Sequence, residues 1–327
     1  MKDLIASFPE NIEESLRIAA SYTLKKPTEE INNVVICGMG GSGIGGKLVS
    51  QWLDSVLDLP VFVCQDYNLP KFVNGSTLVI CSSYSGETEE TLSCLHQAKA
   101  SNAMIIGISS GGSLVNFCKE NNYDCMLIPS GNPPRTALAF SVGQLLTIFY
   151  QLDLTDDSFI ENYLTSNKIL LSNSHQIHQK AKELAHFLKG KNLLMYAASN
   201  YEAVAIRARQ QFNENAKILC NHHVIPEMNH NELVGWGLAD ESTGVLIFDS
   251  LDWHPKNQLR LNFCIDHIKT KTPHIFTLTP KGNSLIEKSI YFINVVDWAS
   301  FYLSELNAVD PIEIDVINRL KSFLSKN

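Results

Sequence analysis

A glycine-rich segment, GMGGSGIGG at residues 38–46, has the composition of an anion-binding loop. Glycines at this density allow backbone N–H groups to approach an anion closely, and a helix that begins there adds a favourable dipole. Gly41 and Ser42 are the residues that we expect to contact a phosphate group. A tight turn without a ligand is the alternative, and the number of glycines makes it the weaker one.

Gly38, Gly40 and Gly43 of this segment also match the GxGxxG pattern of dinucleotide-binding proteins. Asp66 follows 23 residues after Gly43, near the position at which an acidic residue binds the ribose in such proteins. A nicotinamide-dependent dehydrogenase is therefore an alternative interpretation of the first segment.

A second segment, SSYSGETEET at residues 82–91, offers hydroxyl groups where a predicted strand passes into a predicted helix. Ser83, Ser85 and Thr88 could surround a phosphate together with the amides at the helix start, without a lysine or a metal. The same residues could simply cap the helix. Two such segments at one edge of a sheet favour a single phosphate between them, because a dinucleotide site would leave these hydroxyl groups unused.

Arg135 follows two prolines, at the expected start of a helix. The prolines stiffen the approach to that helix, and a cation at a helix N-terminus is unfavourable for the helix dipole. Arg135 is therefore expected to meet an anionic group, either on a ligand or on a carboxylate of the protein.

The second half of the chain contains candidate acid–base groups. Glu214, in the segment FNENAK, lies where a predicted helix passes into a strand, and the apolar residues that follow make its partial burial possible. A carboxylate so placed can move a proton between the carbons beside a carbonyl, although a solvated helix-end carboxylate is the ordinary interpretation. His230, between two asparagines in a polar loop, is expected to contact a polar ligand. Glu227 and Glu232 are the competing candidates for the base.

Lys321 lies in a predicted amphipathic helix near the end of the sequence, after Asp310-Pro311. The ordinary interpretation is a solvated side chain on the polar face of this helix. Arg319 and Lys326 are the neighbouring cations that could take the same place.

Metal ligation has little support in the sequence. His222-His223 could suggest a metal, but no cysteine or carboxylate lies at a familiar ligand spacing around the pair. None of the eight cysteines forms a CxxC pair, and most lie in apolar runs, where cysteine behaves as a small hydrophobic residue. We expect no metal site.

The elements that must position these groups alternate between short apolar runs and helical patterns. Apolar runs without polar alternation are typical of strands buried on both faces, and strand–helix alternation implies a mainly parallel sheet with helices on both faces. Strands are expected at residues 34–37, 61–64, 77–82, 104–109, 124–128, 192–198, 217–220, 244–249, 274–279 and 290–296. Helices are expected at residues 43–54, 87–100, 113–121, 135–152, 202–212 and 256–270.

A polar stretch at residues 155–174 separates two halves of similar pattern. We predict two α/β domains, at residues 1–155 and 156–327, which agrees with the expectation that 327 residues exceed one ordinary core. The first domain carries the phosphate-type segments, and the second carries Glu214, His230 and the C-terminal helix.

Composition excludes several classes of protein. The chain is 45% hydrophobic and 18% charged, which excludes wholesale disorder, and its net charge of −8 argues against a broad nucleic-acid-binding face. No apolar run approaches the roughly 20 residues that cross a bilayer, and the first residues lack a signal-peptide layout. We expect a soluble cytoplasmic protein with no nucleic-acid or membrane partner.

The segments GMGGSGIGG and SSYSGETEET resemble the sugar isomerase (SIS) domain, a flavodoxin-like fold that binds phosphosugars. Two such domains in 327 residues resemble the bifunctional phosphoglucose/phosphomannose isomerases, and the resemblance covers nearly the whole chain. It implies two flavodoxin-like SIS domains in which four residues carry the chemistry. By their positions in the family's motifs, Glu214 matches the base that moves a proton between C1 and C2 and Arg135 the residue that stabilises the enediolate. His230 and Lys321 match the residues that open the sugar ring, and the resemblance implies a homodimer in which His230 comes from the neighbouring subunit.

We therefore expect an aldose–ketose isomerase that interconverts glucose 6-phosphate or mannose 6-phosphate with fructose 6-phosphate through a cis-enediolate. The hexose 6-phosphate would be held through its phosphate by residues of both segments, namely Gly41, Ser42, Ser83, Ser85 and Thr88. No metal or redox cofactor is expected, because the carbonyl migrates without net electron transfer. The remaining alternative is a non-catalytic phosphosugar-binding regulator, but such proteins usually add a helix-turn-helix and a basic face, neither of which is evident here.

Overall fold

The apolar runs in the first half of the chain form a five-stranded parallel sheet in the computed structural model, which describes residues 1–324 and 326. Its strands are β1 (Asn33–Cys37), β2 (Val61–Cys64), β3 (Thr77–Ser82), β4 (Met104–Ser109) and β5 (Asp124–Leu127). The order across the sheet is β2-β1-β3-β4-β5, which is the flavodoxin-like order. Every residue of β3 is buried, as expected for a central strand covered on both faces.

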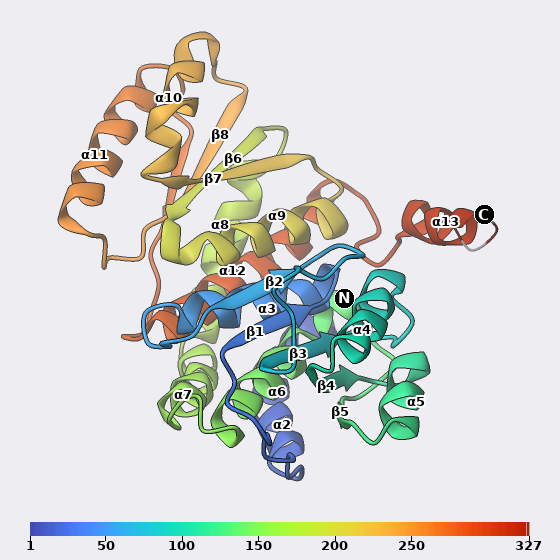
Figure 1. Cartoon of the computed structure of the whole chain (residues 1–327). Helices are drawn as coiled ribbons and strands as arrows, with labels where there is room; N and C mark the ends of the chain where they lie inside the picture. Colours follow the sequence, from blue (N-terminus) through green and yellow to red (C-terminus); the bar gives the residue numbers. More distant parts are fainter. Residues whose placement is uncertain (325, 327) are drawn as a thin grey trace. The chain divides into compact units, whose positions relative to one another are not determined.

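Helices cover both faces of this sheet (Figure 1). On one face α3 (Gly40–Leu53) packs on α6 (Leu138–Gln151), and α6 packs on α2 (Phe8–Ala19). On the other face α4 (Glu89–Ala100) lies beside α5 (Gly112–Glu120), and both contact β4. The predicted doubly covered parallel sheet is therefore confirmed.

The second half of the chain repeats this architecture with a four-stranded parallel sheet. Its strands are β6 (Asn192–Ala198), β7 (Cys220–Ile225), β8 (Thr243–Phe248) and β9 (Ile275–Leu278), in the order β7-β6-β8-β9. The main helices around it are α8 (Ser174–Leu188), α9 (Glu202–Ala216) and α11 (Pro255–Lys269).

Two predicted strands of the second half are wrong. The strand expected at residues 217–220 starts only at Cys220, because α9 continues to Ala216 and Lys217 ends it in the left-handed conformation, with φ at +57°. The strand expected at residues 290–296 is part of the 22-residue helix α12 (Leu285–Leu306). Residues on every side of this part of α12 are buried, among them Ile290, Phe292 and Val295, and a helix buried all round has no apolar periodicity that distinguishes it from a buried strand.

The described residues form two compact units. The N-terminal unit comprises Ala6–Ser172 and Lys281–Ile290, and the C-terminal unit comprises Met1–Ile5, Asn173–Pro280 and the described residues from Tyr291 onward. Helix α7 (Ser158–Ser172) follows the expected boundary at residue 155 and packs on α2 of the N-terminal unit. The remaining elements are α1 (Lys2–Ala6), η1 (Pro134–Thr136), η2 (Ser199–Tyr201), η3 (Glu227–His230), α10 (Glu232–Gly235), η4 (Trp236–Leu238) and α13 (Asp315–Leu324).

A buried ion pair joins α9 to α12 within the C-terminal unit. The Nη2 atom of Arg207 lies 2.9 Å from the Oδ2 atom of Asp297, and both side chains are almost fully buried. Burial raises the pKa of Asp297, and the charge of Arg207 opposes that rise.

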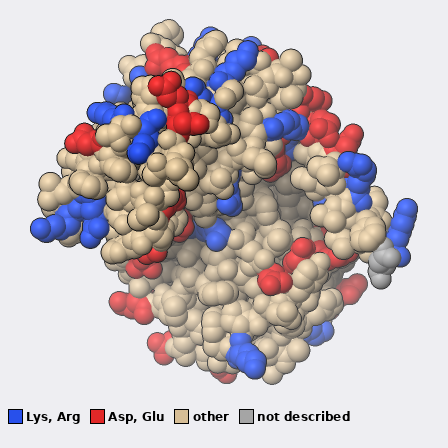
Figure 2. Space-filling model, turned by 90° about the horizontal axis from the view of Figure 1, so that it is seen from above, with Lys and Arg blue, Asp and Glu red and all other residues tan. Residues whose placement is uncertain are grey.

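No helix in the described part of the chain combines the length and the apolar character that crossing a bilayer requires. On the face of the molecule in Figure 2, lysine and arginine side chains are interspersed with aspartate and glutamate.

Candidate functional site

The glycine-rich segment forms the connection between β1 and α3. The helix begins at Gly40, three residues earlier than predicted, so that Gly41 and Ser42 lie in its first turn. A Cβ atom on Gly38 would lie 2.8 Å from the carbonyl oxygen of Ser82 at the end of β3. The glycine at this position therefore allows the two neighbouring strands to deliver their loops to the same place.

The hydroxyl-rich segment connects β3 to α4, at the same carboxyl edge of the sheet. The hydroxyl groups of Ser83 and Thr88 lie 2.9 Å apart, and the amide of Gly86 donates to Ser83 Oγ at 3.1 Å. Ser85 is exposed, and its hydroxyl accepts a hydrogen bond from the amide of Glu87 at 3.2 Å. The structure therefore brings the hydroxyl groups of Ser83 and Thr88 together, Ser83 buried and Thr88 half-buried, while Ser85 lies at the surface of the same loop.

Tyr84, which the sequence analysis did not single out, joins the two loops. Its amide donates to the hydroxyl of Ser42 at 3.2 Å. Its phenolic oxygen accepts a hydrogen bond from the amide of Asn132 at 2.9 Å, in the segment that leads to Arg135. In the sequence, only its position between two serines sets this aromatic residue apart. Its role depends on contacts between three loops that are distant in sequence.

Arg135 lies in the short helix η1, directly before α6, and its side chain is buried. The backbone of η1 packs on the first loop at Gly41, where a Cβ atom would lie 2.7 Å from the carbonyl oxygen of Pro134 and 3.2 Å from the amide nitrogen of Arg135. Because a buried cation must be matched by negative charge, this position fits the predicted contact with an anionic group.

Asp66, the acid of the dinucleotide alternative, lies in the exposed connection after β2. Its Oδ1 atom accepts a hydrogen bond from the amide of the next residue, Tyr67, at 2.6 Å. The carboxylate is therefore engaged locally in the turn.

In the C-terminal unit, Glu214 lies in the last turn of α9 and is half-buried. The helix end around it is firmly held. The ammonium group of Lys217 donates to the carbonyl oxygen of Glu214 at 2.6 Å, and the buried side chain of Asn215 donates to Ser300 Oγ on α12 at 2.9 Å. This anchoring fixes the backbone from which the Glu214 carboxylate projects.

His230 lies at the end of η3, which follows β7, and its side chain is exposed. The adjacent Met228 is fully buried and anchors the loop. The competing acid Glu232 accepts a hydrogen bond from the hydroxyl of Tyr196 at 2.5 Å and lies 3.4 Å from Nδ1 of His223. Burial, together with Glu232, raises the pKa of Tyr196. Glu232 therefore has a local structural role.

Lys321 lies in α13, a helix whose residues are all exposed. Arg319 and Lys326 are exposed as well. Glu214, His230 and Lys321 thus come from three separate elements of the C-terminal unit, in agreement with their wide spacing in the sequence.

Within the described residues, one group of three or more side chains has a metal-ligating arrangement, and it consists of Cys37, Cys64 and Cys94 in the N-terminal unit. The pair His222-His223 is not part of such a group.

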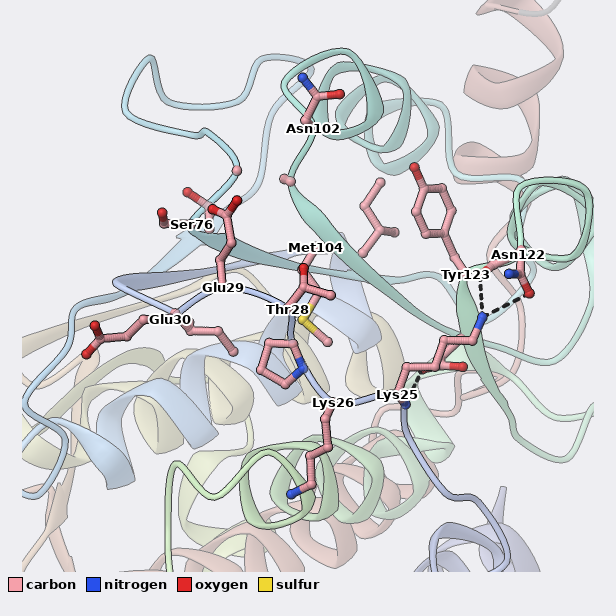
Figure 3. A pocket seen from close by; sticks show the side chains of 17 residues that line it. Lys25, Lys26, Thr28, Glu29, Glu30, Ser76, Asn102, Met104, Asn122 and Tyr123 are labelled. Carbon is pink, nitrogen blue, oxygen red and sulfur yellow. Dashed lines mark hydrogen bonds between the residues drawn. The ribbon is translucent and has the colours of Figure 1, made fainter.

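A cavity of about 250 Å³ lies at the opposite edge of the N-terminal sheet (Figure 3). It is lined by residues that precede β1 and by the amino ends of β3, β4 and β5. The ammonium group of Lys25 points to Asn122 there, donating to its side-chain oxygen at 2.9 Å, and the amide of Lys25 donates to Asp124 at 2.8 Å. Ligands of parallel α/β sheets bind at the carboxyl ends of the strands, so the candidate site is the one formed by the two loops.

The flavodoxin-like sheet and its joined loops define an SIS-type domain, and comparisons with known proteins agree. Residues 29–150 match the SIS domain family, and residues 177–324 match the family described as bacterial phospho-glucose isomerase C-terminal SIS domain. The C-terminal domain of glucosamine-fructose-6-phosphate aminotransferase from Francisella tularensis has a similar fold, with a TM-score of 0.74 at 15% identity over 94% of this chain and 96% of that one.

Relatives that match over their full length show to which family of SIS-domain proteins the chain belongs. The chain is 35% identical to the bifunctional phosphoglucose/phosphomannose isomerase of Caldicellulosiruptor bescii, over 100% of this chain and 99% of the relative. It is 34% identical to the protein of the same name from Aquifex aeolicus, over 93% and 94% of the two chains. The chain belongs to the bifunctional phosphoglucose/phosphomannose isomerase family.

Proposed function

We propose that the protein is an aldose–ketose isomerase that interconverts glucose 6-phosphate and mannose 6-phosphate with fructose 6-phosphate. The observation that carries the proposal is the hydrogen bond from the Tyr84 amide to Ser42 Oγ. It joins the glycine-rich loop and the hydroxyl-rich loop at the carboxyl edge of the sheet. Membership of the isomerase family supports it over the regulator and the dehydrogenase.

The substrate phosphate would be held by the first turn of α3 and by the hydroxyl-rich loop, through Gly41, Ser42, Ser83, Ser85 and Thr88. Hydroxyl groups and helix N-terminal amides bind a phosphate monoester without a basic side chain. A single phosphate therefore needs no broad positive surface, which is compatible with the net charge of −8.

The chemistry would be carried by proton transfer. Glu214 removes the C2 proton of the open-chain aldose, the electron pair of the broken C–H bond forms the C1–C2 double bond of the cis-enediolate, and the carbonyl pair moves to O1. Glu214 then returns a proton to C1, C2–O2 becomes the new carbonyl, and the proton of the O2 hydroxyl passes to O1. Arg135 stabilises the negative charge on the enediolate oxygens. Aldose and ketose are isomers, so the reaction needs no oxidant or reductant.

Ring opening precedes this transfer, and we assign it to His230 with Lys321. His230 would move a proton between O5 and O1 of the pyranose. As the family resemblance implies, we assign His230 to the site of the neighbouring subunit of a homodimer, with which its exposure in the single chain is compatible. The eight unpaired cysteines are compatible with a cytoplasmic location, where thiols stay reduced.

The test is to incubate the purified protein with fructose 6-phosphate and to quantify glucose 6-phosphate and mannose 6-phosphate by NMR, with and without EDTA. We expect both aldose phosphates to form, each at a rate that EDTA does not change. Binding of fructose 6-phosphate without turnover would replace the isomerase by the regulator, and turnover that EDTA abolishes would overturn the metal-free mechanism.

A further inference from the structure

The parallel register of the N-terminal sheet places three cysteines side by side. Cys37 at the end of β1 is the partner of Cys64 in β2 and of Cys81 in β3. Residues in register on neighbouring parallel strands point to the same face of the sheet. The three thiols therefore form a row across the carboxyl ends of β2, β1 and β3, directly before the glycine-rich loop.

Helix α4 adds a further thiol above this row. The Sγ atom of Cys94 lies 3.8 Å from that of Cys64, and the Sγ atoms of Cys37, Cys64 and Cys94 all lie within 4.8 Å of one another. All three residues are at most 4% exposed. Three sulfur ligands from three different elements thus converge on one buried point.

One pair of these sulfur atoms has the spacing of a metal–thiolate site. Zn–S bonds of about 2.3 Å in tetrahedral geometry place neighbouring sulfur atoms about 3.8 Å apart. The separation of the Cys64 and Cys94 sulfur atoms already has this value, and the separations to Cys37 are at most 4.8 Å, so a cation could be bound after small shifts of these side chains.

Carbonyl oxygen atoms of the connection after β2 also lie close to these sulfur atoms. The carbonyl oxygen of Asp66 lies 3.3 Å from Cys94 Sγ, and that of Asn68 lies 3.3 Å from Cys64 Sγ. Residues 66–68 are exposed, so the segment whose carbonyl oxygens lie against the thiols is itself at the surface. A cation could enter by displacement of that segment.

We propose that Cys37, Cys64 and Cys94 form a binding site for a soft d10 cation, Zn²⁺ or Cu⁺, next to the start of the glycine-rich loop. Three thiolates select such cations over Mg²⁺ or Ca²⁺, because soft sulfur ligands prefer soft metals. The thiol protons leave to solvent when the cation binds. The site lies outside the set of residues assigned to isomerisation, and the proposal does not depend on that activity.

A titration of the reduced full-length protein with Cd²⁺ tests the site, because cadmium–thiolate bonds absorb in the ultraviolet. The expected result is a charge-transfer band that saturates at one equivalent. The Cys94→Ala variant should bind Cd²⁺ at least about 10-fold more weakly. Cys118→Ala is the matched control, since Cys118 is an equally buried cysteine on the neighbouring helix α5 and lies outside the cluster.

Competition with a chromophoric chelator, under argon for Cu⁺, then measures Zn²⁺ and Cu⁺ separately. Binding of either at one equivalent, with the same dependence on Cys94, supports the proposal. A wild-type protein that binds neither, or a Cys94→Ala variant that remains folded by circular dichroism and binds as tightly as the wild type, would overturn it. A Cys64→Ala variant repeats the comparison from strand β2 and should lose the band as well.

Discussion

The backbone amide of Tyr84 donates a hydrogen bond of 3.2 Å to the hydroxyl of Ser42. The two residues are 42 positions apart in the sequence, and each belongs to one of the loops that we assign to the substrate phosphate. Loops that are joined in this way are preorganised, because their relative position does not have to be ordered when the phosphate binds.

Removal of the Ser42 hydroxyl should weaken substrate binding more than it slows the chemical step. The Ser42→Ala variant loses a hydrogen bond to the second loop and a contact to the phosphate, and its KM for fructose 6-phosphate should rise about 10-fold, equivalent to about 1.4 kcal/mol. Steady-state kinetics measure the change. Ser50→Ala on the same helix removes a hydroxyl that bonds the carbonyl of Val61, and should leave KM unaltered. Equal effects of the two substitutions would contradict the role of Ser42.

A methyl group at Gly41 should displace Arg135. The added Cβ atom would lie 2.7 Å from the carbonyl oxygen of Pro134, closer than van der Waals contact allows, so η1 must move. A displacement near 1 Å at a catalytic group costs about 100-fold in rate, and we expect kcat/KM of Gly41→Ala to fall by about that factor. Gly75→Ala is the control, because a Cβ atom there has no neighbour closer than 3.6 Å. A Gly41→Ala enzyme as active as Gly75→Ala would show that η1 does not position the arginine.

Replacement of Glu214 by glutamine should remove the base and preserve binding. Loss of general base catalysis lowers rates by about 10²- to 10⁴-fold, so kcat should fall in this range with KM nearly unchanged. Glu202→Gln, an exposed carboxylate at the start of the same helix, should keep wild-type kinetics. A Glu214→Gln variant that binds fructose 6-phosphate and turns over at near the normal rate would refute the assignment.

The buried ion pair in the C-terminal unit predicts a stability effect that is not additive. Arg207→Met leaves Asp297 buried without its cation and should destabilise the protein by about 3–5 kcal/mol. The double variant Arg207→Met/Asp297→Leu should recover most of this loss, since both charges are removed. Urea denaturation followed by circular dichroism measures both. Lys180→Met, which breaks an exposed pair with Glu183, should cost less than about 1 kcal/mol.

Stability should also depend on pH through His178, which lies against Trp298 and bonds the hydroxyl of Tyr302 at 2.8 Å. Burial, followed by the charges of Lys182, Lys2 and His175, lowers the pKa of His178 below its ordinary value of 6.5. Near and below that pH the unfolded chain takes up a proton that the folded chain does not, so stability falls as the pH falls from neutrality. Thermal unfolding midpoints between about pH 7.5 and about pH 5.5 should decline less in His178→Gln than in the wild type.

The matched control for this pH dependence is His186→Gln, an exposed histidine on the same helix α8. It should retain the wild-type decline. If His178→Gln shows the same decline as His186→Gln, the pH dependence has another origin.

Local sequence was sufficient to predict the first sheet almost to the residue. Its strands are short, mainly β-branched and aliphatic runs, most of which end at or just before a glycine, serine or proline, and each run is too short for a helix. The same rule failed at residues 290–296, because this short apolar run lies inside the 22-residue helix α12, where residues on every side are buried. The apolar pattern alone does not distinguish a buried strand from a segment of a helix that is buried on all sides.

Features that depend on contacts between distant segments were not predictable in the same way. The serines of the two loops could be singled out by type, but the position of Tyr84 between Ser42 and Asn132 exists only when three loops meet. The row of Cys64, Cys37 and Cys81 likewise depends on strand register. In the sequence these cysteines are isolated residues in apolar runs, a pattern that predicts only core positions.

The most direct test of proton transfer through an enediolate follows the deuterium of glucose 6-phosphate labelled at C2. The protein is incubated with this substrate until forward and reverse cycles reach equilibrium, and NMR quantifies fructose 6-phosphate, mannose 6-phosphate and residual deuterium. We predict that both products form and that deuterium is lost from the sugar to water, because the proton on Glu214 exchanges with solvent during repeated cycles. Absence of fructose 6-phosphate, or its formation with all deuterium retained on the sugar, would contradict the proposed isomerase mechanism.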